Sequence, residues 1–354
     1  MKIQFNFSSK IIIFLAIVIL IALSFHILDT KNTSSNEVIF NNLEGNGTNQ
    51  NPYQIFNTQQ LNSIRYSKNS SYILKKDIDA ERTKYWNKGR GFNPIGNYES
   101  DDEFKGIIYG RNNTISNLHI KRPLKSHTGL ISYSSGSIIQ NLNIKSASVT
   151  GSHHTGMLIG STGHNVSIQN VNISGSVKGQ NRTGGLVGSL GIESKIQRSI
   201  SKSNVSGNRF VGGLVGYNQF SSTITQSVSL SAVNGTNIAT GGLVGRNEGS
   251  IVRSHADSLV SGNDRVGGLA GDNLGYPKQK TNPKIIESNS NSKVSGKRNV
   301  GLFVGYNGLT SKYQPENKNY TVIIDNSSYV SKKDFEGIAQ NNGEIVDLEV
   351  KQRP

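Results

Sequence analysis

The sequence predicts an all-β fold, a parallel β-solenoid of about nine coils. A glycine motif of five residues recurs with a period near 28 residues over most of the chain. A run of alternating apolar and polar residues occurs in each period, and no segment with helical periodicity is long enough for a crossover helix. Hydrophobic residues make up only 34% of the 354 residues, and 39 residues are glycine, which favours a thin repetitive core over a globular one.

The glycine motif appears in four strict copies, Gly-Gly-Leu-(Val/Ala)-Gly, and in five looser ones. The strict copies begin at Gly184, Gly212, Gly241 and Gly267, and the looser ones at Gly106, Gly129, Gly156, Gly301 and Gly337. A fixed period of this length is typical of a solenoid in which each repeat forms one coil. Because stacked strands lie about 4.8 Å apart, we expect each Leu and Val to lie on its counterpart in the next coil and to form an apolar column.

Two further elements complete each predicted coil. Residues 168–173 and 196–200 alternate apolar and polar side chains, which is the pattern of a half-buried strand. A short third element, for example residues 204–207, leads back to the glycine motif. Five motif copies carry an asparagine two residues after the closing glycine, and we expect the amides of these side chains to form a hydrogen-bonded ladder: Asn112, Asn218, Asn247, Asn273 and Asn307.

The N-terminal segment is distinguished by its hydrophobicity. Residues 11–28 form a largely apolar run after Lys2 and Lys10, which predicts a signal peptide or an N-terminal membrane anchor within residues 1–28. Residues 29–43 are then a linker. Either interpretation places the rest of the chain outside the cytoplasm, secreted or at the cell surface.

Residues 44–105 are predicted to cap the first coil with an α/β unit. Asn57, followed by Gln60 three residues later, is a candidate N-cap pair for a short helix that runs to about Ser67. A helix at this position would cover the open edge of the first coil, where an exposed strand invites end-to-end association. The solenoid itself is expected over residues 106–350.

The repeats and the leader together resemble the GLUG-motif proteins. The resemblance rests on the Gly-Leu-(any)-Gly repeats and on leader segments at residues 45–48, 51–55, 60–64, 77–79, 93–96 and 104–118. In that family the repeats build right-handed β-solenoids on bacterial and archaeal surfaces, and they occur in filamentous-haemagglutinin-like adhesins and in the stalks of some IgA-specific zinc metallopeptidases. The resemblance therefore implies a right-handed coil and a surface role.

Catalytic and metal-binding motifs are missing from the sequence. It has no His-Glu-x-x-His pair and no cysteine, and the lone doublet His153-His154 cannot supply the three or four convergent ligands that a metal needs. The carboxylates are scattered, and a glycan-cleaving pair would require Asp264 and Asp272 to approach each other. We therefore predict no catalytic residue, no metal, no cofactor and no enzymatic activity, with a glycan-cleaving β-helix enzyme as an alternative.

The basic character belongs to the exported part of the chain, because the net charge of +15 falls only to +13 without Lys2 and Lys10. Two or three residues before the first glycine, four motif copies carry arginines that stacked coils would align in a basic column: Arg182, Arg209, Arg265 and Arg298. Two long periods place extra residues in loops that supply further candidate binding residues: Tyr276, Lys278, Lys280, Lys312 and Tyr313. The arginines are also compatible with an ordinary solvated surface, and the Tyr and Pro residues with simple rigidification of the loops.

These observations favour a non-catalytic adhesion or binding module, at the cell surface or secreted, that engages a glycan or an anionic polymer. A structural shaft or surface-layer component that self-associates along the solenoid is the alternative. Nucleic acid is not expected as a physiological partner of an exported chain. Contact with a membrane is expected only through the N-terminal segment, if that segment is not cleaved.

Overall fold

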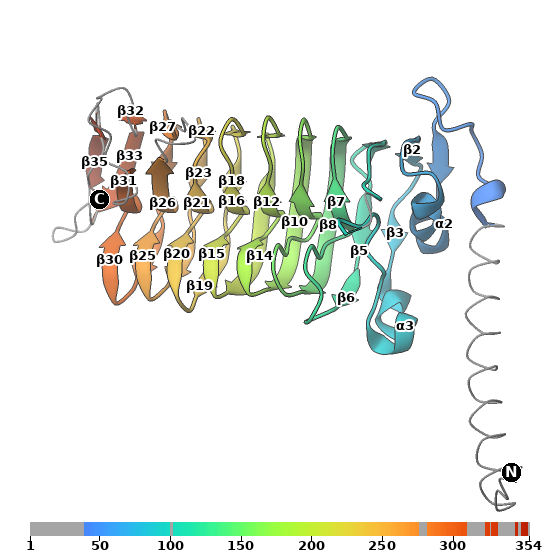
Figure 1. Cartoon of the computed structure of the whole chain (residues 1–354), viewed down its shortest axis with the longest axis horizontal. Coiled ribbons are helices and arrows are strands. Elements are labelled where there is room, and N and C mark those ends of the chain that lie inside the picture. Colours follow the sequence, from blue (N-terminus) through green and yellow to red (C-terminus); the bar gives the residue numbers. More distant parts are fainter. Residues whose placement is uncertain are drawn as a thin grey trace, which may run out of the picture.

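The computed structural model describes residues 39–99, 102–275 and 282–309, and the backbone of four later strands between residues 323 and 352. The chain is an all-β parallel solenoid of about six turns. Its coils lie side by side along the long axis of the molecule, with the leader at one end (Figure 1). No helix within the described residues is long and apolar enough to cross a membrane, and the predicted signal peptide or anchor lies outside them.

The strands of the solenoid form three sheets, and the turns from β11 Asn181–Gly184 onward pass through all three. The glycine-motif sheet has seven strands: β7 Ile131–Ser134, β9 Ile159–Thr162, β12 Val187–Leu190, β16 Val215–Asn218, β21 Val244–Asn247, β26 Ala270–Gly275 and β31 Val304–Leu309. The corner sheet has five strands, each directly before a glycine motif: β11 Asn181–Gly184, β15 Arg209–Gly212, β20 Ile238–Gly241, β25 Asp264–Gly267 and β30 Arg298–Gly301. The remaining strands form one large sheet of 23 strands.

The large sheet begins with long strands in the solenoid and continues with shorter ones. The long strands are β8 Ile138–Thr150 and β10 Ser167–Lys178. Later turns divide the same path: β13 Lys195–Gln197, β14 Ile200–Gly207, β17 Thr223–Thr225, β18 Val228–Ser229, β19 Ala232–Gly235, β22 Ser250–Val252, β23 His255–Ala256, β24 Leu259–Ser261, β27 Lys284–Ile286, β28 Asn289–Ser290 and β29 Lys293–Ser295. The last strands of the sheet are β32 Ile323–Asp325, β33 Ser327–Ser331, β34 Glu344–Ile345 and β35 Leu348–Gln352.

The predicted apolar column is confirmed. Val187, Val215 and Val244 are fully buried, and the pairing register places each beside the next. Isoleucines of the large sheet, such as Ile168 and Ile196, pair in the same way and belong to the same hydrophobic cluster. Full burial of one such side chain is worth about 1.5–3 kcal/mol, so a narrow column repeated over several turns stabilises the stack.

The closing glycine of the motif is explained by a close approach of two backbones. A Cβ atom on Gly216 would lie 2.6 Å from the carbonyl carbon of Arg182, which belongs to the corner of the preceding turn. A Cβ atom on Gly271 would lie 2.6 Å from the carbonyl carbon of Ala239. Arg182 and Ala239 have left-handed φ values of 58° and 61°. Each corner therefore presses against the glycine-motif strand of the next turn, where no side chain fits.

The coil count is lower than the nine predicted. Seven motif copies, from the Gly129 copy to the Gly301 copy, form the glycine-motif sheet, and six full turns lie between its first and last strands. The place beside β7 in this sheet is instead taken by Ile95 and Phe104, which form bridges to Ile131 and Ser134. The copy that begins at Gly106 is therefore displaced into the large sheet, and the copy at Gly337 lies outside the described residues.

The leader extends the solenoid and is not a separate α/β cap. Its elements are β1 Tyr53–Ile55, α2 Thr58–Ser63, η1 Ile64–Tyr66, β2 Ser71–Leu74, β3 Ile78–Asp79, η2 Glu81–Tyr85, α3 Trp86–Gly89, β4 Ile107–Tyr109, β5 Thr114–Ser116 and β6 His119–Lys121. β1, β2, β4 and β8 pair successively in parallel, because Tyr72, Ile108 and Ile139 continue the apolar column.

The predicted N-cap of the leader helix is confirmed. Asn57 accepts a hydrogen bond of 2.9 Å from the backbone N–H of Gln60, and the Gln60 side chain accepts one of 2.7 Å from the backbone N–H of Phe56. The α-helix ends at Ser63, and η1 continues it to Tyr66. Helices α2 and α3 lie at the N-terminal end of the stack (Figure 1).

Polar ladders line the core beside the apolar column. Asn218, Asn247, Asn273 and Asn307 are buried, and each amide donates to the next at 2.7–2.8 Å, which confirms the predicted ladder for these four. Asn112 is not part of it, because its motif copy belongs to the large sheet and the residue lies in a left-handed turn with φ of 63°.

A serine ladder was not predicted. The backbone N–H groups of Ser199 and Ser227 each donate to the side chain of the corresponding serine one turn later, Ser227 and Ser254, at 3.2 Å. These side chains are buried, and each donates in turn to the carbonyl two residues before it. Such pairing lets serine occupy a buried corner, which explains how so few apolar residues suffice for the core.

Candidate functional site

The four arginines that were predicted to align, Arg182, Arg209, Arg265 and Arg298, lie in two adjacent columns. We name the column of Arg209 and Arg298 the outer column and the column of Arg182 and Arg265 the inner column. Arg209 lies in the column of Asn181, whereas Arg182 and Arg265 lie one position further along their strands. The cause is the spacing to the glycine motif, which is two residues for Arg182 and Arg265 but three for the other two. Because successive side chains on a strand point to opposite faces, a shift of one residue changes the column. The prediction of a single basic column is therefore wrong.

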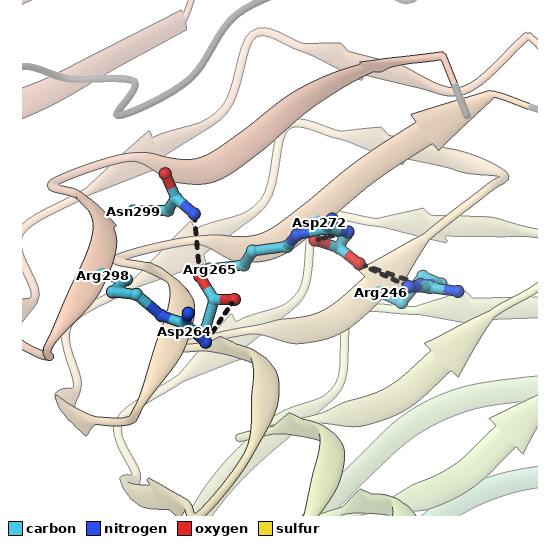
Figure 2. A network of polar contacts seen from close by, with 6 residues as sticks. All are labelled: Arg246, Asp264, Arg265, Asp272, Arg298 and Asn299. Atoms are coloured by element: carbon cyan, nitrogen blue, oxygen red, sulfur yellow. Dashed lines mark hydrogen bonds and ion pairs between the residues drawn. The ribbon is translucent and has the colours of Figure 1, made fainter. Parts of the chain in front are cut away.

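The outer column contains a carboxylate as well as arginines. Arg298 pairs in register with Asp264, and its guanidinium lies 3.3 Å from the Asp264 carboxylate (Figure 2). Asn299 donates a second hydrogen bond to the same carboxylate at 2.8 Å. This ion pair is largely exposed on the arginine side, so its contribution to the free energy of unfolding is about 0–1 kcal/mol.

The inner column faces the outer side chains of the glycine-motif sheet, and together they form what we name the edge stack. Its corner residues all have left-handed φ values, which turn their side chains toward the neighbouring strand. The edge stack consists of Tyr98, His127, Tyr133, His154, Arg182, Phe210, Tyr217, Arg246, Arg265, Asp272 and Tyr306.

The part of the edge stack nearest the leader is a pile of planar groups. The rings of Tyr98 and His127 are parallel within 13° with centroids 4.4 Å apart, and those of His127 and His154 are parallel within 10° at the same distance. The Arg182 guanidinium lies between two rings. Its Nη1 is 3.1 Å from Nε2 of His154, and its carbon is 4.9 Å from the centroid of the Tyr217 ring. Stacking thus continues across coils without a break.

The remaining part of the edge stack is held by a buried carboxylate. Asp272 is fully buried, and its Oδ2 accepts hydrogen bonds from Nε and Nη2 of Arg246 at 3.0 and 2.7 Å (Figure 2). Its Oδ1 receives no hydrogen bond, although Nη1 of Arg265 lies 3.6 Å away. Arg246 also lies 4.0 Å from the centroid of Phe210, and Arg265 lies 4.6 Å from that of Tyr306.

Burial sets the charge of the edge stack. Burial lowers the pKa of His127 to about 4, and the nearby Arg182 contributes to the same direction. Burial, followed by the charges of His127 and Arg182, lowers the pKa of His154 to about 3. Both imidazoles are therefore neutral at pH 7, and Arg182 supplies the positive charge beside them.

One buried acid lies beside the edge stack. Glu248 is 3% exposed, and burial raises the pKa of its carboxyl to about 7, although a hydrogen bond from Tyr217 and the charge of Arg246 oppose the rise. The sequence contains no signal for this residue, because its burial depends on the neighbouring turn, where its backbone N–H donates to the Asn218 carbonyl at 2.8 Å.

A cleft of about 360 Å³ opens over the pile of planar groups. Its lining includes Tyr98, Tyr133, His127, His154 and Arg182, together with Ser161, whose hydroxyl is hydrogen-bonded to Nδ1 of His127. Tyr98 is 52% exposed, so a flat ligand can reach a ring face there. The cleft therefore offers what a small polar ligand with one apolar face requires: ring surfaces, hydroxyl groups and a cation.

The other predicted site residues have different outcomes. Tyr276, Lys278, Lys280, Lys312 and Tyr313 lie outside the described residues. The described part of the chain holds no group of three or more His, Asp or Glu side chains that could bind a metal ion. Asp264 and Asp272, the candidate catalytic pair, are both engaged by arginines.

Sequence reasoning identified Arg182 and Arg265 as candidate binding residues but did not predict the residues that face them. These residues occupy the position between the closing glycine and the asparagine of the motif, namely Tyr217, Arg246, Asp272 and Tyr306, of which only Asp272 was considered from the sequence, and in a catalytic role. Large or charged side chains at this position are the signal that could have found them, because a period-two strand places them outside the core.

Comparison with known proteins supports the fold. No protein-family model matches the chain. A stretch of 139 residues, 38% of this chain, is 39% identical to Halomucin from Haloquadratum walsbyi, and the match spans only 2% of the length of Halomucin. The structure resembles that of a candidate immunoglobulin A1 protease from Bacteroides ovatus, with a TM-score of 0.55 and 18% identity over 87% of this chain and 86% of that chain.

A second structural match is a chain described as IgA1 Protease, with a TM-score of 0.52 and 17% identity. It covers 78% of this chain but only 21% of that chain. At these identities the two structural matches show a shared solenoid fold.

Proposed function

We propose that this protein is a non-catalytic binding module, at the cell surface or secreted, and that the edge stack holds a glycan. The observation that carries the proposal is the pile of Tyr98, His127, His154 and Arg182 beneath an open cleft. A sugar ring has an apolar C–H face and a rim of hydroxyl groups, so an exposed aromatic ring and neighbouring polar groups complement it. Arg182 would add affinity for a sugar that carries a carboxylate or another anionic group.

Two features support a role in binding without catalysis. Asp272 is enclosed by Arg246 and Arg265, and Asp264 accepts hydrogen bonds from Arg298 and Asn299 (Figure 2). A glycosidase of the common type needs two carboxyl groups that flank the bond to be cleaved. Here both carboxylates join neighbouring turns of the solenoid.

The proposed surface location is supported by one feature of the sequence and by two comparisons. The N-terminal hydrophobic segment predicts export, part of the chain is similar to Halomucin, and the fold is shared with chains described as immunoglobulin A1 proteases. Retention by residues 11–28, if they are not cleaved, would anchor the module to a membrane. The loop residues Tyr276, Lys278, Lys280, Lys312 and Tyr313 would add contacts for longer ligands.

The test is binding of the full chain, purified in a mild detergent, to a panel of neutral and acidic oligosaccharides at low and high salt. We expect saturable binding that Tyr98→Ala weakens at least about tenfold, because the exposed ring face is lost. Tyr85→Ala is the matched control, since Tyr85 is 73% exposed and lies outside the edge stack. Equal affinity of the Tyr98→Ala and unaltered chains would contradict the proposal, and end-to-end assembly without any glycan binding would favour a structural shaft.

A further inference from the structure

The strongest unassigned feature is a basic cavity in the leader, separate from the edge stack. It has a volume of about 790 Å³ and lies between a loop over residues 86–91 and a turn over residues 121–126. Its charged lining, which we name the basic pocket, consists of Lys88, Arg90, Lys121, Arg122, Lys125 and Glu99. Five cations against one carboxylate leave a formal charge of 5 − 1 = +4 around a single cavity.

The loop that carries Lys88 and Arg90 is held in an unusual backbone conformation. Asn87 and Lys88 have φ values of 53° and 58°, and Gly89 and Gly91 have φ values of 78° and 80°. The Asn87 side chain donates a hydrogen bond of 2.8 Å to the Gly91 carbonyl and closes the loop. Left-handed backbone of this kind is costly for non-glycine residues, and it persists only where the surroundings hold it.

The opposite turn is anchored to the solenoid at both ends. The backbone N–H of Lys125 donates to the Arg122 carbonyl at 2.9 Å, with Pro123 at the second position of the turn. The backbone N–H of Arg122 donates to the Thr150 carbonyl, and the backbone N–H of Ser152 donates to the Lys125 carbonyl, both at 2.8 Å. The two cations at the ends of the turn are therefore fixed to the end of β8.

Hydrogen bonds also join the loop to the turn. The backbone N–H of Lys121 donates to the Arg90 carbonyl at 2.8 Å, and Nε of Arg122 donates to the Phe92 carbonyl at 3.3 Å. The backbone under the basic pocket is thus a pre-formed frame, and the Arg122 side chain is held in it by its own hydrogen bond. Pre-organised cations lose less entropy when an anion binds.

The electrostatics show that these cations repel one another. Burial lowers the pKa of Arg122, and the charge of Arg90 lowers it further. Burial also lowers the pKa of Lys125, with Arg122 acting in the same direction and Glu99 opposing. Within the described residues, Arg90, Lys121, Arg122 and Lys125 form no ion pair with a carboxylate, and the nearby Asp102 pairs with Lys68 at 2.8 Å.

We propose that the basic pocket binds a polyanion, a surface polymer that carries several sulfate or phosphate ester groups. A single monovalent group would match one of Arg90, Lys121, Arg122 and Lys125, which form no ion pair within the described residues, whereas closely spaced oxyanions match several of these cations at once. A concave cavity admits a segment of a polymer chain, while a flat bilayer surface would meet only its rim. This site goes beyond the glycan cleft of the edge stack and does not depend on it.

The test uses the full chain in a mild detergent, with dextran sulfate and inorganic polyphosphate as probes and uncharged dextran as the reference. The double variant Arg90→Gln/Lys121→Gln removes two exposed cations whose side chains make no described ion pair. Its matched control is Lys195→Gln/Lys202→Gln, which removes two exposed lysines from the solenoid and lowers the net charge equally.

We expect salt-sensitive binding of at least one polyanion, weakened at least about tenfold in the pocket variant and less than about twofold in the control. Binding of dextran sulfate alone indicates a sulfated polymer, and binding of polyphosphate alone indicates a phosphate-rich one. Equal losses in both variants, or no binding to either probe, would overturn the proposal. Both variants should keep the melting temperature of the unaltered chain to within a few degrees.

Two further arms distinguish polyanion binding in the basic pocket from glycan binding in the edge stack and from contact with a membrane. Tyr98→Ala should leave polyanion binding unchanged, and Arg90→Gln/Lys121→Gln should leave neutral glycan binding unchanged, so that the failure of one proposal does not imply the failure of the other. Leu124, at the tip of the turn, is 95% exposed. Binding to vesicles of anionic lipid that is lost in Leu124→Ser, without binding to either polymer, would identify a membrane contact and overturn the polyanion site.

Discussion

The edge stack and the basic pocket both gather cations on one side of a turn, but they treat them in opposite ways. In the edge stack, Arg246 and Arg265 contact the Asp272 carboxylate, and each also covers an aromatic ring. In the basic pocket, the charge of Arg90 lowers the pKa of Arg122, and Glu99 is the one carboxylate among the described residues of the lining. The comparison indicates that an arginine stabilises the fold where the strand register places a carboxylate or a ring beside it. Where the register places no such partner beside it, the arginine is a candidate binding group.

The difference also shows why net charge alone does not locate a site. The chain carries a formal charge of +15, and arginines recur beside many glycine motifs. Most of the arginines near the edge stack contact a ring or a carboxylate, so much of their charge is compensated locally. Stability measurements on both regions test this contrast.

The largest effect is expected from loss of the buried carboxylate in the edge stack. Asp272→Asn removes the buried carboxylate that Arg246 and Arg265 contact, and we expect the free energy of unfolding to fall by about 3–5 kcal/mol. Chemical denaturation of the two chains measures this difference. Asp257→Asn, at an exposed position of the same solenoid, is the control and should change little. A loss below about 1 kcal/mol for Asp272→Asn would show that the contacts of Asp272 with Arg246 and Arg265 contribute little to stability.

A smaller effect of defined pH dependence is expected at Glu248. Its pKa of about 7 in the folded chain lies above the ordinary value of 4.5, so the stability that its protonated form contributes is complete below pH 4.5 and is lost as the pH rises through about 7. Glu248→Gln resembles the protonated acid. It should therefore raise the free energy of unfolding by about 1–3 kcal/mol at pH 8 and change it little at pH 4.5.

Melting temperatures at the two pH values test this expectation, with Glu193→Gln as an exposed control. The same stabilisation at pH 4.5 as at pH 8 would mean that burial of the charge is not its cause.

The neutral imidazoles of the edge stack predict a dependence in the acid range. The pKa values of His127 and His154 in the folded chain, about 4 and about 3, lie below the ordinary 6.5. The unfolded chain therefore binds these protons first, and stability falls as the pH drops from about 6.5 towards 3. The double variant His127→Asn/His154→Asn should lose less melting temperature between pH 7 and pH 4 than the unaltered chain. Asparagine tolerates the left-handed backbone at both positions.

The smallest change in the free energy of unfolding is expected in the basic pocket, where a substitution should stabilise the chain slightly. Removal of repelling cations relieves a cost, so Arg90→Gln/Lys121→Gln should leave the free energy of unfolding unchanged or raise it by about 0.5 kcal/mol at low salt. Denaturation at two salt concentrations measures this, because the gain should shrink as salt screens the repulsion. A loss of stability would mean that these two residues support the leader, as the arginines of the edge stack support the solenoid.

Sequence periodicity was enough to predict the parallel solenoid, its apolar column, most of the asparagine ladder and the N-cap at Asn57. These features depend on spacing that repeats from coil to coil, or on partners only three residues apart. They can therefore be recognised in the linear sequence. The serine ladder follows the same period. It could have been predicted from the serine that recurs in the alternating run of successive periods, at Ser199, Ser227 and Ser254.

Which charged groups meet depends on how the turns pack in three dimensions. The one-residue shift of Arg209 and Arg298 relative to Arg182 is visible in the spacing to the glycine motif, but the groups that each arginine meets are not. The bridges from Ile95 and Phe104 displaced the Gly106 copy from the glycine-motif sheet. The basic pocket joins a loop near residue 90 to a turn near residue 122, which lie about 30 residues apart without a shared motif. The physical reason is that face and register depend on the partner strand, and a partner across a turn leaves no trace in local sequence.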